Sequence, residues 1–480
     1  MLLERPPATT TRRSLRDCVV PLAGPALIAW ATCSGTPTDS ERAARTDVAV
    51  VSQRYRPGDA KPALPALTTA SPLADFLEFA MLHSPRVEAA YYAWTAAVEQ
   101  IAPARSLPDP RLTFEADITD TVETLMPGLM IDLPGPGKLR AAGDVMAAGS
   151  RSAYFGFERE VLRTALAVKG AYYRLHFLEE TIRVQKETLR LLGEIEQLAR
   201  QQNAAGRVSL QDVLRAQIAR DQIETQLANF EDSRGTLAAE WKAALGLGPA
   251  EFDPPLPQSF EPSVGEPRAD DLLATALRRN PDLRAMESDV RSAEASLALA
   301  RKSGVPDFSI GAEVDVKASP VMVRPTAGMT LPIWRDKIAA QIAGAQAGKR
   351  AAEARLTAEQ VAIAAELASM LYMYRESVRN DALLTEKLVP KARQSLDAAR
   401  SGYVNGRAGF LDVIDAQRTL LDFELMGIEA RTQRELALAS LSLAIAGVPP
   451  PNAPLLEHGP SDASTEPAPA RTSTPEEAHR

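Results

Sequence analysis

Hydrophobic positions along the chain follow two different periods, and the period changes in a fixed order. Between residues 71 and 105, apolar side chains recur every three or four positions, which is the spacing of an amphipathic helix. Between residues 108 and 134 they alternate with polar side chains, as in strands whose two faces differ. The helical period then returns from about residue 137 to 202 and, after a break, from about 208 to 245. The pattern predicts a helix, a β-hairpin and a long helical hairpin.

The whole order occurs twice. The segment GRVSLQDVLRAQ, Gly206 to Gln217, returns as GRAGFLDVIDAQ, Gly406 to Gln417, with six of twelve positions identical. PDPRLTFEADI at 108–118 likewise corresponds to PDFSIGAEVDV at 306–316. The spacing between these matched positions is 198 to 200 residues. Several matches in the same order indicate a tandem duplication.

These patterns divide the chain into six parts. The parts are a signal peptide at 1–33, an extended N-terminal segment at 34–70, a first repeat at 71–248, a proline-rich connector at 249–269, a second repeat at 270–447 and a disordered tail at 448–480. Each repeat contains one β-hairpin, at about 108–134 and 306–332, and one long helical hairpin with its tip at about 203–209 and 402–409. A glycine supplies the turn at each tip.

The helical hairpins carry an apolar seam of coiled-coil spacing. The stretch that begins at Gly137 has about 65 residues without a proline, or roughly 100 Å of helix at 1.5 Å per residue. In the second arm of each hairpin the apolar residues follow steps of three and four, which Arg220 and Arg234 interrupt in the first copy. They are Val213, Ala216, Ile223, Leu227, Phe230, Leu237 and Trp241 in the first copy, and Val413, Ala416, Leu420, Phe423, Ala430 and Leu441 in the second.

Each β-hairpin is predicted to have one apolar and one polar face. The apolar face carries Leu, Phe, Ile and Val side chains, and each strand spans about ten residues, the length that crosses a bilayer at a tilt. Two soluble hairpins with one wet face would show the same alternation. The polar positions are Arg111, Glu115, Asp117 and Asp132 in the first copy, and Glu313 and Asp315 in the second.

Four amphipathic strands in lipid predict an oligomer. Four strands cannot close a barrel, and an open strand edge leaves backbone groups unpaired in lipid. Two chains would supply eight strands with a filled interior, whereas three would supply twelve strands around a lumen. The polar face would then line water. The predicted fold class is therefore mainly α with a transmembrane β-barrel shared between chains and continued by a long α-helical barrel.

Composition narrows the chemistry further. The net charge is −8 and no basic stripe with interleaved aromatics is present, which argues against nucleic acid as a partner. Four scattered histidines and eleven methionines without a cluster predict no metal site and no cofactor. No nucleophile–base pair stands out, so we expect no enzyme.

The N-terminus has the pattern of a secretory signal. Arg12, Arg13 and Arg16 precede an apolar run at 18–31, which is too short for a membrane-spanning helix. Cys33 follows this run and resembles the acylated cysteine of a bacterial lipoprotein, although cleavage elsewhere would leave it without a role. With only two cysteines, both near this end, the mature chain has no internal disulfide framework.

On these features the chain resembles TolC-type outer-membrane efflux channels. The resemblance covers about residues 70–446 and rests on the duplicated order, on the tips, and on the Asn280-Pro281-Asp282-Leu283 entry to the second repeat. The segment LPGPGKLRAAGDV, Leu133 to Val145, is closer to members of the heavy-metal cation efflux branch. The resemblance implies a homotrimer with a twelve-stranded barrel in the bacterial outer membrane and a helical tunnel across the periplasm.

The same resemblance implies partners and a cargo. The partners would be a periplasmic adaptor (membrane fusion protein), an inner-membrane pump of the resistance-nodulation-division type and outer-membrane lipid. The chain would then be a passive duct for small solutes, either metal cations or drugs. Two alternatives stay open, namely a type I secretion channel for polypeptides and a soluble periplasmic coiled-coil scaffold.

The tips hold the candidate functional residues. Asp412 and Asp415 lie one helical turn apart, and three chains would place a ring of carboxylates at the tunnel mouth. By resemblance these two residues match the aspartates of the periplasmic constriction, and Asp212 and Tyr403 match residues that hold this mouth shut. Solvated acids near a helix N-terminus would show the same pattern. Residues predicted to dock the adaptor are Gly206, Arg207, Val208, Ser209 and Leu210 in the first tip, and Gly406 and Arg407 in the second.

Overall fold

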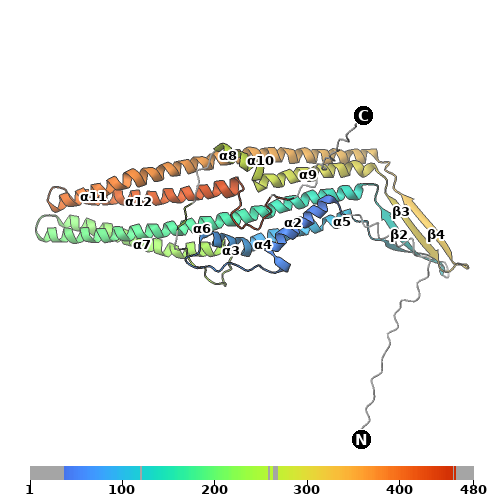
Figure 1. The fold of residues 1–480 in the computed structure, drawn as a ribbon, viewed down its shortest axis with the longest axis horizontal. Coiled ribbons are helices and arrows are strands. Elements are labelled where there is room, and N and C mark those ends of the chain that lie inside the picture. The colour runs from blue at the N-terminus through green and yellow to red at the C-terminus, as the bar shows by residue number, and fades with distance from the viewer. Residues whose placement is uncertain (1–36, 119–121, 258–259, 263–268, 458, 461–480) are drawn as a thin grey trace, which may run out of the picture.

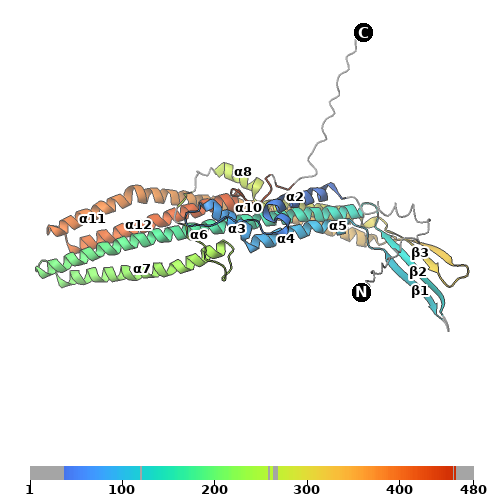
Figure 2. The same cartoon turned by 60° about the horizontal axis from the view of Figure 1, so that its bottom comes forward.

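The computed structural model describes residues 37–118, 122–257, 260–262, 269–457 and 459–460. The molecule is a long rod in which nearly all helices run along one axis, with a small sheet at one end and two helical tips at the other (Figures 1 and 2). The signal peptide, Cys33 and residues 461–480 lie outside the described residues. No helix in the described part is both long enough and apolar enough to cross a membrane.

Each repeat contributes short helices, two strands and two long helical arms. In the first repeat these are α3 (Leu73–His83), α4 (Pro85–Glu99), α5 (Ile101–Arg105), β1 (Arg111–Ile118), β2 (Val122–Leu133), α6 (Lys138–Ala204) and α7 (Leu210–Ala244). In the second they are α8 (Ala269–Arg279), α9 (Pro281–Arg301), β3 (Phe308–Asp315), β4 (Met322–Met329), α10 (Arg335–Leu383), α11 (Val389–Val404) and α12 (Phe410–Ala439). The order matches the duplication read from the hydrophobic pattern.

The first arms of the two helical hairpins differ in one respect. α6 runs unbroken for 67 residues, as its lack of proline predicts. Its counterpart is interrupted between α10 and α11 by a π-helical turn, Leu384–Leu388, and Pro390 is the second residue of α11. Because Pro390 has no N–H to donate, it cannot sit in an ordinary α-helical turn without losing a hydrogen bond.

The four strands form one antiparallel sheet in the order β1-β2-β3-β4, so β2 and β3 join the two repeats. The pairs Leu112–Leu129 and Ile131–Ile310 lie on one face. On the other face, Glu313 is paired with both Gly128 and Arg324. This register confirms the predicted alternation and extends a single apolar face over all four strands.

Glycines lie where the polar face is crowded. A Cβ on Gly128 would come within 2.6 Å of Glu313 Cγ, and one on Gly328 within 2.6 Å of Ser309 Oγ. A Cβ on Gly311 would come within 2.7 Å of Thr326 Oγ1. Side chains on this face therefore converge, as they do on the concave side of a curved sheet, and glycine permits the close approach.

The N-terminal segment predicted to be extended is largely helical. α2 (Asp39–Tyr55) begins at Thr38, whose side chain accepts from the Glu41 N–H, and Val51 and Tyr55 are buried in the core. Glu41 forms an ion pair with Arg105 of α5. Because α2 has few apolar residues and a polar sequence, its helical period was too weak to predict, and contacts with distant helices stabilise it.

The prediction of a disordered tail is wrong for residues 448–457. Leu455 is buried, and the Leu456 N–H donates to Tyr154 Oη at 3.1 Å. Asn452 donates to Glu78 at 2.9 Å. The segment therefore lies across α3 and α6, where the buried Leu455 and these two hydrogen bonds hold it.

Candidate functional site: the helical tips

The two helical tips lie side by side at the end of the rod opposite the sheet (Figure 1). Each turn is closed by a glycine with positive φ, +71° at Gly206 and +72° at Gly406. The backbone N–H of the residue after each glycine donates to a carbonyl in the last turn of the preceding helix. The Arg207 N–H donates to Gln202 O at 2.9 Å, and the Arg407 N–H donates to Gly402 O at 2.7 Å. Both tips therefore end in the left-handed glycine cap that the repeated Gly-Arg pair predicts.

The second arms of the two helical hairpins, α7 and α12, start differently. Ser209 caps α7, since its Oγ accepts from the Asp212 N–H at 3.3 Å while Asp212 Oδ2 accepts from the Ser209 N–H at 3.2 Å. In the second copy Gly409 has no side chain, and only the Gly409 N–H to Asp412 Oδ2 bond remains, at 2.8 Å. The two copies therefore differ in capping, and both aspartates accept backbone bonds at their own helix start.

A groove separates the two tips and gathers residues that the sequence placed in two groups. Asp212 and Tyr403, predicted for the gate, line it together with tip residues predicted for docking, namely Arg207, Val208, Ser209 and Gly406. Asp412, Asp415, Gly206, Leu210 and Arg407 do not line it. Candidates for the gate and for docking thus share one surface within a single chain.

Tyr403 is one of two buried aromatic residues in this groove, and Phe410 is the other. Its side chain is 6% exposed, and its ring lies 5.8 Å from that of Phe410 in an edge-to-face arrangement. Its hydroxyl has no hydrogen-bond partner among the described residues. Burial raises the pKa of Tyr403, and the negative charge of Asp212 raises it further, so the hydroxyl stays protonated. Phe410 was not predicted for this site, although it aligns with Leu210 of the first tip.

Asp412 and Asp415 are exposed on one face of α12, one turn apart. Neither carboxylate forms an ion pair with another described residue. Arg407 is exposed as well. Two unpaired acids on a free surface form a local negative field, which is the feature a ring of carboxylates requires.

An exposed apolar stripe follows the start of α7, and of its three residues the sequence predicted only Leu210 as part of the site. Leu210, Leu214 and Ile218 are 63%, 49% and 57% exposed and lie four residues apart on one face. Their spacing of four residues was the signal that could have revealed Leu214 and Ile218, because both lie outside the apolar seam of α7.

The polar face of the sheet holds the other predicted group. Arg111 pairs with Asp132, and Thr124 donates to Asp117 at 3.1 Å. Glu115 is exposed. Asp315 differs from the prediction, because it is 4% exposed and accepts from the Lys317 and Ala318 N–H groups at 3.0 and 3.2 Å. It holds the β3–β4 turn and does not offer its carboxylate to water.

No group of three or more His, Cys, Asp or Glu side chains able to hold a metal ion occurs in the part of the chain that the structure describes.

Comparison with known proteins identifies relatives for both repeats. The sequence model of the family described as outer membrane efflux protein matches residues 77–247 and 272–447. The chain is 24% identical over 350 residues to the cobalt-zinc-cadmium resistance protein CzcC of Cupriavidus metallidurans, covering 69% of this chain and 80% of that one. It is 24% identical to outer membrane protein OprJ of Pseudomonas aeruginosa, covering 62% and 63%.

Solved structures share the fold. The outer membrane protein VceC of Vibrio cholerae superposes with a TM-score of 0.66 at 19% identity, covering 78% of this chain and 96% of that one. The MtrE outer membrane channel of Neisseria gonorrhoeae, in its open state, superposes with a TM-score of 0.67 at 18% identity, covering 80% and 94%.

Proposed function

Because the chain belongs to the outer membrane efflux protein family, we propose that it is the outer-membrane channel of a tripartite efflux system. It is an outer membrane protein, as are its relatives. In the proposal it is a passive duct for solutes that an inner-membrane pump delivers through a periplasmic adaptor. The carrying observation is the single four-stranded amphipathic sheet at one end of the helical rod.

The sheet supports assembly into a trimer. Among the described residues, β1 and β4 each have one edge without a partner strand, and Leu112, Phe114 and Ile310 are more than half exposed on the apolar face. An unpaired edge next to an exposed apolar face is unfavourable in both water and lipid. Twelve strands from three chains would close the sheet around a lumen, with its crowded polar face inward.

The charges of that polar face favour cations as cargo. Glu115, Asp117 and Glu313 lie on it, together with Arg324 and the Arg111–Asp132 pair. The excess of carboxylates, repeated in three chains, would raise the local concentration of cations. The similarity to a cobalt-zinc-cadmium resistance protein points the same way, toward metal cations as the exported solute.

The tips would form the periplasmic mouth. Asp412 and Asp415 would supply a carboxylate ring, and Tyr403 and Asp212 would adjust how closely the two tips pack. The adaptor would dock on the tip residues predicted from sequence and on the apolar stripe of Leu210, Leu214 and Ile218. Docking that favours separated tips would open the mouth by a shift in population.

The start of α2 supports a lipid anchor at Cys33. Glu41 near that start pairs with Arg105, six residues before β1, so the described chain begins close to the sheet. Thr38 is five positions after Cys33, a reach of at most about 18 Å. An acyl chain on Cys33 would therefore enter the lipid beside the barrel.

Mass and conductance test the proposed function. The full chain, purified in detergent, should have the protein mass of three copies by light scattering and should form ion-conducting pores in planar bilayers. A monomer that stays in solution without detergent and forms no pores would overturn the proposal.

A further inference from the structure

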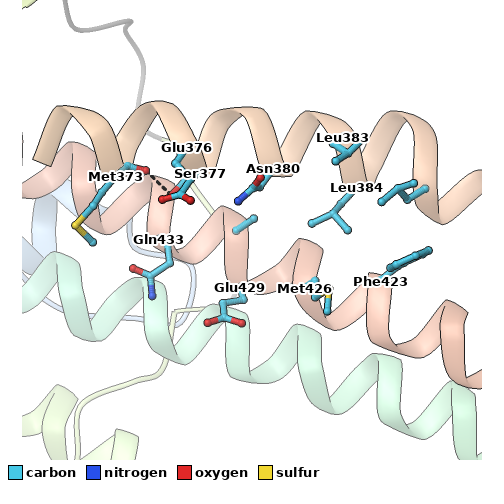
Figure 3. A pocket seen from close by; sticks show the side chains of 12 residues that line it. Met373, Glu376, Ser377, Asn380, Leu383, Leu384, Phe423, Met426, Glu429 and Gln433 are labelled. Carbon is cyan, nitrogen blue, oxygen red and sulfur yellow. Dashed lines mark hydrogen bonds between the residues drawn. The ribbon is translucent and has the colours of Figure 1, made fainter. Parts of the chain in front are cut away.

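A second groove lies between α10 and α12, away from the tips and the sheet (Figure 3). It encloses about 440 Å³, within the range of roughly 300–1,000 Å³ typical of small-molecule sites. Its apolar wall includes Met373, Leu384, Phe423 and Met426. Two carboxylates, Glu376 on α10 and Glu429 on α12, belong to the same lining.

The groove exists because the second repeat has small residues where the first has large ones. Positions 200 residues apart correspond in α7 and α12, as the tip sequences show. In the first repeat Leu227 and Phe230 of α7 fill the space against α6. Gly427 and Ala430 occupy the corresponding positions of α12. Large-to-small replacement without collapse of the surrounding helices leaves a hollow.

The opposite wall of the groove carries a helix irregularity at the same level. The π turn at Leu384–Leu388 contributes Leu384 and Leu388 to the lining. Leu384 Cβ lies 3.8 Å from where a Cβ on Gly427 would be, so the turn faces the small residues of α12 directly. A π turn inserts an extra residue into a helix, is costly, and occurs frequently at functional sites.

The lining is suited to a ligand that is both apolar and positively charged. Met373 and Met426 are 38% and 53% exposed, although both are apolar. No Lys or Arg lines the groove, and neither Glu376 nor Glu429 forms an ion pair with another described residue. Methionine adapts to varied ligand shapes, and the ring of Phe423 can hold a cation over its face.

We propose that this groove is a binding site for an amphiphilic organic cation, with one site in each chain. The site goes beyond the proposed function, since one chain forms it whatever the oligomer and whatever cargo passes through the lumen.

The probe is tetraphenylphosphonium, titrated calorimetrically into the full-length protein in a non-ionic detergent. We expect saturable binding of one cation per chain. Ala430→Phe, which restores the residue of the first repeat, should abolish binding by filling the groove. Glu376→Gln with Glu429→Gln should weaken binding about tenfold, because the cation loses both carboxylates and keeps only its apolar contacts. This second variant changes two partly exposed polar side chains and leaves the helix packing intact.

Two controls separate the groove from general effects. Glu366→Gln with Glu386→Gln removes the same charge from exposed positions outside the groove and should leave affinity unchanged. Tetraphenylborate has the same shape with negative charge and should not bind. Absence of binding to the parent protein, equal affinity for Ala430→Phe, or equal binding of the borate would overturn the proposal. None of these results bears on the mass or conductance of the assembly.

Discussion

Asn280 and Gly447 are in contact, although they lie near the start and at the end of the second repeat. Asn280 Nδ2 donates to Ala444 O and Ile445 O at 3.1 and 3.2 Å, and a Cβ on Gly447 would lie 3.1 Å from Asn280 Cα. The first repeat has the same joint, with Gly246 against Ser84. In each repeat, therefore, a glycine at the end packs against a residue near the start. That residue immediately precedes the proline that begins a helix.

This joint predicts that Gly447→Ala destabilises the protein. Gly447 has φ +61°, and a Cβ would come within 2.7 Å of Arg279 O, a backbone atom that cannot move cheaply. Strain and overlap together should cost about 2–3 kcal/mol, measured as a lower unfolding temperature by circular dichroism. Gly206→Ala is the matched control, because φ is +71° there and nothing lies within 4 Å. It should cost only about 1 kcal/mol, and equal losses would contradict the contact.

Removal of the exposed acids should change conduction at the mouth. Asp412→Asn with Asp415→Asn removes two unpaired carboxylates per chain without changing their size. In planar bilayers we expect a higher leak conductance and weaker block by multivalent cations, since the negative field is lost. Asp221→Asn with Asp232→Asn, at exposed positions of α7 farther from the tip, should change neither. If both pairs behave alike, Asp412 and Asp415 do not belong to the gate.

Tyr403→Phe should not destabilise the tips. The buried hydroxyl has no partner among the described residues, so its removal costs no hydrogen bond. We expect an unfolding free energy within about 0.5 kcal/mol of the parent, or slightly higher. Tyr403→Ala, which also removes the ring packed on Phe410, should cost about 3 kcal/mol or more. A large loss with phenylalanine would show that the hydroxyl is bonded.

Glu158 predicts a pH dependence of stability. Burial raises its pKa from 4.5 to about 7, against the attraction of Arg284 and Arg279. Because the folded state binds this proton more tightly than the unfolded state, the contribution is fully present below pH 4.5 and is lost as pH rises through about 7. The shift corresponds to about 3 kcal/mol.

Thermal unfolding of the parent between pH 5 and pH 8 should therefore show stability falling toward the alkaline side. Glu158→Gln keeps the size of the side chain and removes its titration. The stability of this variant should therefore change less with pH over this range. An identical slope for parent and variant would exclude Glu158 as the source. Glu160→Gln, two residues along α6, serves as the control for charge.

How far the sequence predicts this protein depends on the range of the forces involved. Alternation of polar and apolar residues placed Leu112 and Arg111 on opposite faces, because side-chain direction in a strand repeats every two residues. Gly206 and Gly406 marked the tips, because only glycine adopts their left-handed turn freely. These features depend only on residues that are close in the chain. Because of the duplication, each pattern occurs twice in the sequence.

Tertiary structure decided the features that depend on distant partners. α2 is helical because Arg105 and the aromatic core meet it, and residues 448–457 are ordered because α3 and α6 accept them. The pairing of β2 with β3 and the meeting of Tyr403 with Asp212 join segments from different repeats. The groove at Ala430 arises only when the π turn lies opposite a missing side chain. Local pattern sets each element and its faces, whereas packing between elements sets which surfaces are filled and which stay open, since close packing depends on the shapes of both partners.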